Sequence, residues 1–495
     1  MIAAVMKIRV VFASLFFATA TSLLAANTNS VVRTITLRSC IERALMDNLE
    51  IRFERINPSI ASWGVTLEAG AFDPNFTAGA IYNDSSTPSA TAGPTEKRQL
   101  TPTLGLGGTL TSGTGYNLGV TDSRTGGTGY NDYLYTGNAS LTLTQPLLKN
   151  FGFDANTAQY RVARKKRDIA IQNFQMLVMN KIGDVSKAYY ELVYAIENHK
   201  ALVEDLGRAK QLLDENRRRV QIGVMSPLDV TQAEAGVAER EEVVIVAERT
   251  IKDNENTLKR LITGEMQRFQ GESLAPVDYP IVEMIETDVT RSTRAALESR
   301  PDFNAAKQEV ERQNILVKWK QNQLWPELDL QGSYGMNGLA YSGFHTLTAR
   351  EFSNDNPAWS VGLSISFPLG NRKARSHYNI ARLDREQALI TLKQLEQNIV
   401  LAVDNAVGRL QTNLKRVDAT RAASRLAAES LKAEETKLRA GASTSFLVLQ
   451  AQSQLAAAKA AEIRARADYS ESLITLDLAE GNTLRKNNIT LDDRF

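Results

Sequence analysis

The side chains that most often carry out chemistry in proteins are few in this sequence and lie far apart. Its 495 residues include three histidines, His199, His345 and His377, and one cysteine, Cys40. A structural zinc site needs about four closely spaced Cys or His ligands, and a disulfide needs two cysteines. The sequence therefore predicts no metal, no cofactor and no internal disulfide.

One segment approaches a phosphate-binding loop but lacks its decisive residue. Gly108 and Gly113 have P-loop spacing, yet Thr114 stands where the motif requires lysine. No nucleophile has a base and an orienting group at a recognisable spacing. The sequence therefore predicts that the protein is not an enzyme.

The charge balance excludes another broad class of function. The chain has 58 Lys and Arg residues against 56 Asp and Glu residues, so its net charge is close to zero. Proteins whose main task is to bind nucleic acid usually carry a large basic surface. No nucleic-acid partner is therefore expected.

Residues 1–26 have the pattern of a secretory signal peptide. Lys7 and Arg9 precede a mostly apolar run, and small residues allow cleavage after Ala20 or Ala26. The run is too short and too polar to favour a membrane anchor. Beyond it no long apolar stretch remains, so we expect an exported protein that can cross a membrane only with strands.

The rest of the chain contains one plan twice. Strand ends, helix breaks and final helix ends recur about 220 residues apart, which indicates an internal duplication. We therefore divide the chain into a first repeat, 27–270, and a second repeat, 271–495. The landmarks are Pro146 and Pro368, Gly223 and Gly441, and Gly264 and Gly481.

Each repeat is expected to combine helices with β segments, which makes the fold class mixed α and β. The first repeat should contain a helix, β segments within 72–147, a long helix 155–222 and a helix 226–263. The second should contain a helix 287–325, β segments within 328–368, a long helix 372–440, a helix 444–480 and a C-terminal tail.

The long helices are indicated by apolar residues that recur every three or four positions, as between Ile171 and Leu213. The mean period is about 3.5, which is typical of a coiled-coil seam. At 1.5 Å per residue, 155–222 would form a rod roughly 100 Å long. A compact domain cannot enclose such a rod.

The β segments alternate apolar with small polar residues, a pattern that favours the wall of an outer-membrane β-barrel. Between Trp359 and Phe367, apolar residues alternate with Ser and Gly over a reach of roughly 30 Å. The small polar face suits a water-filled lumen. The spacing suggests four strands in the first repeat and two in the second, with 84–98 and 123–134 as loops. One chain has too few strands to close a wide barrel, so several copies must share one.

These features together resemble the TolC-type outer membrane efflux protein family, over nearly the whole chain from Thr36 to Gly481. Each motif is weak alone, but all occur in order. They are Thr36-Leu37, Ile41 to Leu45, Asn48-Leu49, Arg300-Pro301-Asp302, Trp325-Pro326, and the tip motifs Gly223 to Ala233 and Gly441 to Gln452.

The resemblance implies a homotrimer that shares one outer-membrane β-barrel in contact with lipid, continued by a long periplasmic α-helical barrel. It also implies a periplasmic adaptor that meets the helix tips and an inner-membrane pump. Family barrels take four strands per chain, so the longer first-repeat sheet is a departure; extra strands in the barrel and separate hairpins both remain open. The expected adaptor contacts are Gly223, Val224, Ser226, Gly441, Ala442 and Thr444.

A second departure concerns the periplasmic gate, which the family closes with a tyrosine, an arginine, an aspartate and a ring of carboxylates. Asp229 matches the aspartate, but Leu438 and Ser443 replace the tyrosine and arginine, and Leu447 and Gln450 replace the ring carboxylates. We therefore expect closure by packing, with Leu447 forming an apolar ring in the trimer. Asp229 has an alternative interpretation as the third residue of a capped helix.

The resulting function is a passive exit duct of a tripartite efflux or secretion system, with both cargo and pump class undetermined. The alternative is an exported periplasmic coiled-coil scaffold or adaptor, which would be water-soluble. The two hypotheses differ in whether the alternating segments face lipid.

Overall fold

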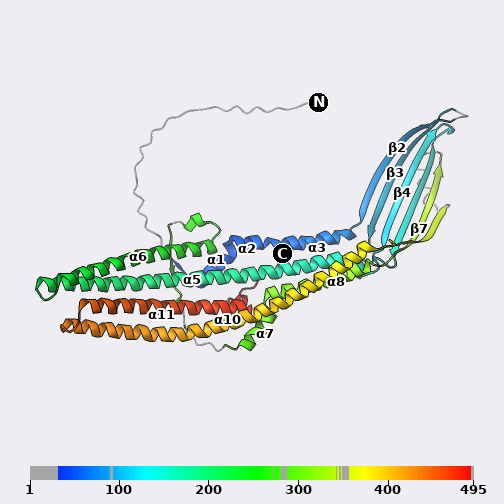
Figure 1. Ribbon diagram of the computed structural model, residues 1–495. Helices are drawn as coiled ribbons and strands as arrows, with labels where there is room; N and C mark the ends of the chain where they lie inside the picture. The colour runs from blue at the N-terminus through cyan, green and yellow to red at the C-terminus, as the bar shows by residue number, and fades with distance from the viewer. Residues whose placement is uncertain are drawn as a thin grey trace, which may run out of the picture.

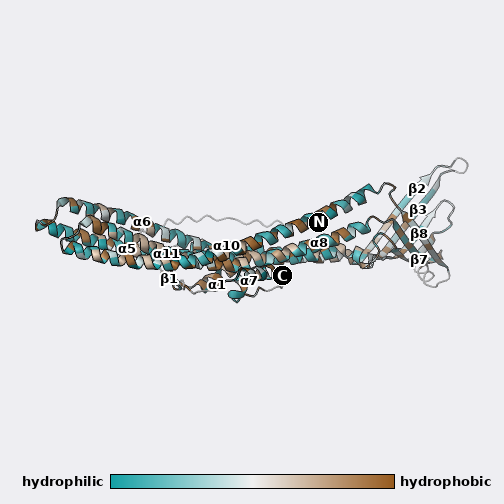
Figure 2. Cartoon of the chain, turned by 60° about the horizontal axis from the view of Figure 1, so that its bottom comes forward, coloured by the Kyte–Doolittle hydropathy of each residue, from teal (hydrophilic) through white to brown (hydrophobic). Residues whose placement is uncertain are grey.

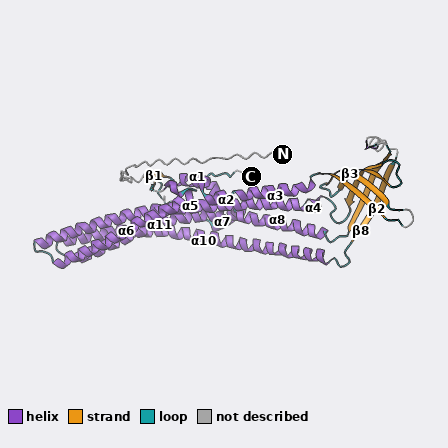
Figure 3. Cartoon of the chain, turned by 90° about the horizontal axis from the view of Figure 1, so that it is seen from above, coloured by secondary structure: helices purple, strands orange, loops and turns teal. Residues whose placement is uncertain are grey.

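The computed structural model describes residues 32–491 except 90–92, 270, 280–281, 283–286, 342, 345–346 and 348–355. The expected signal peptide 1–26 and His345 lie outside the described residues. The described chain is elongated, with a sheet at one end and two helical hairpin tips at the other (Figure 1). The long helices and the large sheet occupy separate parts of the molecule, as Figure 3 shows.

The first part of the chain leads from short helices into a sheet and then into a helical hairpin. Its helices and strands are β1 Val32–Ile35, α1 Leu37–Asp47, α2 Leu49–Glu54, α3 Ile56–Ala69, the 3₁₀ helix η1 Gly70–Phe72, β2 Asn75–Thr87, β3 Thr95–Thr109, β4 Gly115–Gly127, β5 Leu134–Pro146, α4 Phe153–Asn156, α5 Ala158–Gln221, α6 Pro227–Ile262, the 3₁₀ helix η2 Met266–Phe269 and β6 Ser273–Pro276.

The second part follows a similar course with fewer strands. Its helices and strands are α7 Val289–Ser299, α8 Pro301–Asn322, β7 Glu327–Ala340, β8 Pro357–Ser366, α10 Arg372–Arg439, α11 Ser445–Glu480 and α12 Thr483–Lys486. Within the described residues, no helix is both long enough and apolar enough to cross a membrane.

Two helical hairpins form the rod. The helices α5 and α10 contain 64 and 68 residues, which corresponds to about 100 Å each. α6 packs against α5, α11 packs against α10, and α5 also packs against α11. Toward the sheet, α3 and α8 take over as the partners of α5 (Figure 1).

Apolar contacts along these helices are divided among separate clusters because a rod has no single interior. One cluster joins α1 to α5 and α6, with Val178, Tyr189 and Leu258 at its centre. A second joins α7 to α10 and α11 around Val403 and Tyr469. Figure 2 shows hydrophobic and hydrophilic residues interleaved along the same helices. Cys40 is fully buried in the first cluster and lies on α1, which Thr36 caps.

Among the described residues, six strands form one antiparallel sheet in the order β2-β3-β4-β5-β7-β8. The expectation that 84–98 and 123–134 are loops is wrong at their ends. Ser85 pairs with Lys97, and Arg124 pairs with Tyr135, so the strands extend into both segments. Gly, Ser and Thr favour loops locally, but a neighbouring strand that satisfies the backbone hydrogen bonds overrides this preference.

The two faces of this sheet differ in polarity across its whole width. The strand registers align one row of large apolar side chains on one face, Phe76, Leu106, Leu118, Leu141, Tyr334 and Trp359. The adjacent row lies on the opposite face because strand side chains alternate. This second row is Asn75, Gly107, Asn117, Thr142, Ser333 and Ser360.

Two expected helices differ from the structure. The single helix expected over 287–325 is two helices, α7 and α8, because Arg300 adopts an extended conformation, with φ −68° and ψ 124°. A residue before proline avoids the helical region, and Pro301 fits the first turn of the next helix. The helix expected over 155–222 begins later, at Ala158, after the separate short helix α4.

A small parallel sheet of β1 and β6 is an element that the sequence did not predict. It ties the start of the described chain to the segment after α6. The buried hydroxyl of Tyr189 donates a hydrogen bond to the Ile35 carbonyl at 3.3 Å and accepts one from the Asp278 N–H at 3.0 Å. Burial raises the pKa of Tyr189 to about 12.

Candidate functional site

The candidate site is the end of the rod farthest from the sheet, where α5 turns into α6 and α10 turns into α11. At the first turn, Gly223 has a left-handed φ of 78°. Its N–H bonds to the Val220 carbonyl at 3.0 Å, and the N–H of Val224 bonds to the Arg219 carbonyl at 3.0 Å. These are the two bonds of a Schellman motif, which favours glycine at its left-handed position.

The next helix then begins with a side-chain cap. The Ser226 hydroxyl accepts from the Leu228 N–H at 3.3 Å, and the Asp229 carboxylate accepts from the Ser226 N–H at 3.2 Å. Pro227 takes the first helical position. Asp229 thus has the structural role of the capping carboxylate, the alternative interpretation that the sequence allowed.

The second turn repeats this geometry with different side chains. Gly441 has φ 74°, and the N–H of Ala442 bonds to the Lys437 carbonyl at 2.9 Å. The Thr444 hydroxyl caps α11 by accepting from the Leu447 N–H at 3.4 Å. The tip backbone is therefore held in the same conformation in both hairpins, and Val224 is exposed at the first.

Ser443, expected at the gate, contacts its own hairpin. Its hydroxyl donates a hydrogen bond to the Glu434 carboxylate, which also forms an ion pair with Lys437 at 3.0 Å. The hydrogen bond from Ser443, followed by that from Lys437, lowers the pKa of the Glu434 carboxyl. This local pairing holds the end of α10 against the turn.

The two tips are joined by polar contacts that the sequence did not indicate. The Ser445 hydroxyl bonds to the Asn216 side chain at 3.0 Å, and Asn216 donates to the Asp229 carbonyl at 3.3 Å. Arg219 donates to the carbonyl of Leu438 at 3.2 Å. Asn216 and Ser445 are fully buried. Asn216 follows Leu213 by three residues and so continues the apolar spacing of α5. A polar residue at such a position could have indicated this contact.

The remaining gate positions differ in exposure. Leu438 is 5% exposed and packs with Leu212, Val448 and Leu455 between the hairpins. Leu447 is 43% exposed, and Gln450 is also exposed. Among these leucines, only Leu447 has an exposed side chain.

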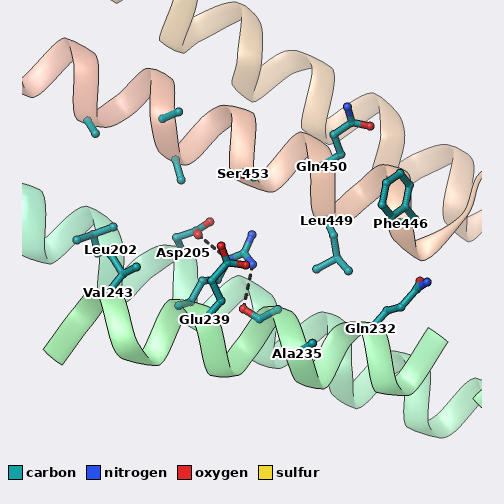
Figure 4. A pocket seen from close by; sticks show the side chains of 15 residues that line it. Leu202, Asp205, Gln232, Ala235, Glu239, Val243, Phe446, Leu449, Gln450 and Ser453 are labelled. Carbon is teal, nitrogen blue, oxygen red and sulfur yellow. Dashed lines mark hydrogen bonds and ion pairs between the residues drawn. The ribbon is translucent and has the colours of Figure 1, made fainter. Parts of the chain in front are cut away.

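A groove of about 740 Å³ lies just above the tips, between α6 and α11 with α5 at its base (Figure 4). Its α11 side is formed by Phe446, Gln450 and a run of small residues that includes Ala456 and Ala460. The small side chains leave the space between the helices unfilled. The alanine-rich stretch 456–461 could have indicated this groove from the sequence.

The floor of the groove carries one buried ion pair. The Asp205 carboxylate accepts a hydrogen bond from the Arg240 guanidinium at 2.7 Å, and Arg240 also donates to the Gly236 carbonyl at 3.0 Å. Asp205 pairs in addition with Arg208 at 3.2 Å. Because these charges satisfy one another, the groove offers mainly shape and apolar surface. In the part of the chain that the structure describes, no group of three His, Cys, Asp or Glu residues could hold a metal ion.

A sequence model of the family described as "Outer membrane efflux protein" matches residues 41–264 and 293–482. The chain belongs to this family. The expected membership of the TolC-type outer membrane efflux proteins is thereby confirmed. The match spans both hairpins and both groups of sheet strands.

The names of related proteins agree with membership of the outer membrane efflux protein family. Outer membrane protein TolC of Salmonella enteritidis is 24% identical over 369 residues, 72% of this chain and 71% of the relative. Outer membrane efflux protein BepC of Brucella suis biovar 1 is 26% identical over 346 residues, 68% of this chain and 70% of the relative. Family members are channels rather than enzymes.

Solved structures of family channels share the fold. The outer-membrane channel OprN superposes with a TM-score of 0.69 at 18% identity, covering 90% of each chain. The Campylobacter jejuni CmeC outer membrane channel gives 0.67 at 17% identity, covering 92% of this chain and 90% of CmeC. The arrangement of long helices and sheet is therefore that of outer-membrane channels.

Proposed function

We propose that three copies of this chain form an exit duct in the outer membrane, through which substrate passes without chemical change from an inner-membrane pump and a periplasmic adaptor to the outside. The observation that carries the proposal is the two-faced sheet at one end of a rod about 100 Å long. A sheet that is apolar on one face and small and polar on the other suits a wall between lipid and water.

The placement of the tips supports the direction of transport. If the sheet lies in the outer membrane, the tips at the other end of the rod point toward the inner membrane (Figure 1). Each half of the chain then contributes a hairpin to a helical tube in the periplasm. The two-repeat organisation, 27–270 and 271–495, explains why the two tips have matching backbone geometry.

We assign adaptor binding to the tips together with the groove above them. Gly223, Val224, Gly441, Ala442 and Thr444 are exposed at the turns, and the groove continues from Phe446 along α11. The groove has small side chains, and its charged groups are already paired with each other. A preformed helix of the adaptor could therefore bind there with little change in the conformation of either protein. Ser226 contributes through the cap that fixes the first turn.

The same end closes the duct in the resting state. Leu447 and Gln450 stand on the exposed surface of α11, whereas Ser445 and Val448 on the same turn are buried. In a trimer, three copies of Leu447 would form an apolar constriction, and such constrictions block ions by dewetting. Asp229, Ser443 and Leu438 stabilise the tips that carry this ring.

Crosslinking in cells tests the proposal. In a Cys40→Ala background, Val224→Cys and Ala442→Cys should each capture an adaptor with a short thiol-reactive crosslinker, and mass spectrometry then identifies the adaptor and its pump. The matched control is Gln394→Cys, an exposed position on α10 about 70 Å from the tip. It should capture no tip-binding protein.

Fractionation separates this proposal from the scaffold alternative. The duct should be found in the outer membrane and require detergent for extraction. Recovery in the soluble fraction, together with failure of both tip cysteines to capture an adaptor, would contradict the duct and favour an exported coiled-coil scaffold or adaptor.

A further inference from the structure

We infer that the membrane wall contains six strands from each chain, so that three copies close an eighteen-stranded sheet by pairing β2 of one copy with β8 of the next. The inference rests on the proposed trimeric duct and concerns how its wall is built. The family resemblance implies four strands per chain, whereas the sheet here has six. The sequence left open whether the extra segments join the wall.

The hydrogen-bond ladders place the additional strands within the sheet. β2 pairs with β3 from Asn75 to Thr87, along its full length, and β3 pairs with β4 from Lys97 to Thr109. A hairpin standing outside the wall would leave β4 as the free edge. Here β4 is hydrogen-bonded on both sides, to β3 and to β5.

The side chains of the first two strands also fit a wall. Phe76 and Leu106 continue the apolar row that runs through β4, β5 and β7 to Trp359 on β8. On the opposite face, Asn75 and Gly107 continue the small polar row. A hairpin in water has no need for a continuous apolar face, so this pattern indicates that β2 and β3 meet the same lipid as β8.

The polarity of β2 and β3 changes where a membrane wall should end. The apolar face of β2 runs from Phe76 to Tyr82, a rise of about 20 Å, close to the apolar band of outer-membrane strands. Just beyond it, Asp84 pairs with Arg98 at 3.6 Å on the same face. These charges would lie at the outer membrane surface.

The two remaining edges fit each other. Neither β2 nor β8 has a second partner strand among the described residues, and exposed edges of this kind favour pairing with another chain. β2 leaves the helical end after α3, and β8 returns to it before α10, so the two edges of neighbouring copies run antiparallel. Their apolar faces also begin at the same level, because Phe76 and Ile365 each lie one residue from the helical end of their strand.

The strand count has a consequence for transport. At equal strand tilt, the diameter of a closed sheet grows with strand number, so eighteen strands enclose a bore about one and a half times as wide as twelve. Sheets of this size leave an aqueous channel. The wall would then admit larger solutes than the tips, and size selection would occur at the ring of Leu447.

Disulfide trapping distinguishes six strands from four. In a Cys40→Ala background, one set of variants combines Ser364→Cys on β8, two residues from its helical end, with Asn75→Cys, Thr77→Cys or Gly79→Cys near the helical end of β2. The matched set combines it with Asn117→Cys, Gly119→Cys or Thr121→Cys on β4, the edge that a four-strand wall would present. Within one chain both β2 and β4 lie too far from β8 for a disulfide, at least about 14 Å away.

We expect oxidation in membranes to give covalent dimers and trimers on non-reducing gels from at least one β2 variant and from none of the β4 variants. Crosslinks from β4 instead of β2, or from neither strand in protein that light scattering shows to be trimeric, would overturn the inference and leave the duct intact. A monomer in mild detergent would overturn the proposed trimeric duct itself.

Discussion

At the scale of single residues, one acidic cluster stands apart from the ordinary surface ion pairs. Arg464 binds Glu191 at 2.6 Å and Asp468 at 2.7 Å, and Glu471 lies 4.0 Å from the same guanidinium. Burial, followed by the hydrogen bond and the charge of Glu191, raises the pKa of Glu471 to about 7. The cluster lies where α5 packs on α11, so its protonation affects the contact between the two hairpins.

We predict that Glu471→Gln removes a pH dependence of stability. The folded pKa lies above the usual 4.5, so the folded protein keeps a proton that the unfolded chain releases. The contribution of this group to stability therefore falls as pH rises from about 4.5 to about 7 and is constant above. Because solvent partly screens this half-buried group, we expect a loss of about 1–2 kcal/mol. Urea unfolding at pH 5 and pH 8 measures it. Glu462→Gln on the same helix is the control, and an unchanged pH difference in Glu471→Gln would contradict the assignment.

Two leucines at the tips should respond in opposite ways to truncation. Leu438→Ala should lower the free energy of unfolding by about 2–5 kcal/mol, because it empties a buried site. Leu447→Ala should cost less than about 1 kcal/mol but raise the current through the closed channel, because it widens the proposed ring. Thermal unfolding and single-channel recording separate the two effects. Strong cation selectivity that disappears in Leu447→Ala or Gln450→Ala would contradict closure by packing.

At the scale of elements, the helical turns depend on two glycines in left-handed conformations. Nothing lies within 4 Å of an added Cβ at Gly223 or Gly441, so alanine would meet backbone strain rather than a clash. We predict that Gly223→Ala and Gly441→Ala each destabilise the local turn by about 1–2 kcal/mol, and that asparagine costs less. Hydrogen exchange of the tip amides measures the change. Equal effects of Ala and Asn would show that the strain argument is wrong.

The same turns show what the sequence could predict. Gly223, Ser226 and Pro227 act on their nearest neighbours, so local chemistry was enough to place the tip. The break between α7 and α8 had a local signal in Arg300-Pro301, which we expected to lie within one helix. The ends of β2 and β4 had no such signal, because Ser85 and Arg124 are held by residues on other strands.

The candidate site likewise contains features that the local sequence predicts and features that only distant contacts determine. Gly441 and Thr444 could be assigned from their types and spacing, whereas the alanine-rich stretch 456–461 hinted at only one side of the groove, whose shape depends on how α6 stands against α11. The burial of Leu438 is likewise a property of two packed hairpins: its neighbours Leu212 on α5 and Leu455 on α11 are far apart in the sequence. Contacts of this kind become visible only when the hairpins are placed side by side.

At the scale of the whole molecule, a single copy leaves long apolar stripes uncovered. On α3, Ile56, Ile60, Trp63 and Leu67 are spaced by three and four residues and so share one helical face. Trp63 is 73% exposed and Leu67 is 76% exposed. The sheet-side part of α10 has exposed apolar residues as well, Ile380, Leu383 and Ile390. An apolar surface of this extent on an isolated chain indicates an interface between molecules.

We predict that the α3 stripe packs against a second copy, and that the double variant Trp63→Ser and Leu67→Ser weakens assembly. Each side chain should contribute about 1.5–3 kcal/mol when buried between copies, so the loss should shift detergent-solubilised protein from trimer toward monomer. Multi-angle light scattering measures the mass, and circular dichroism should show unchanged helix content because neither side chain is buried within one chain. Arg52→Ser on the neighbouring α2 is the control and should stay trimeric. A double variant that remains fully trimeric would place the interface elsewhere.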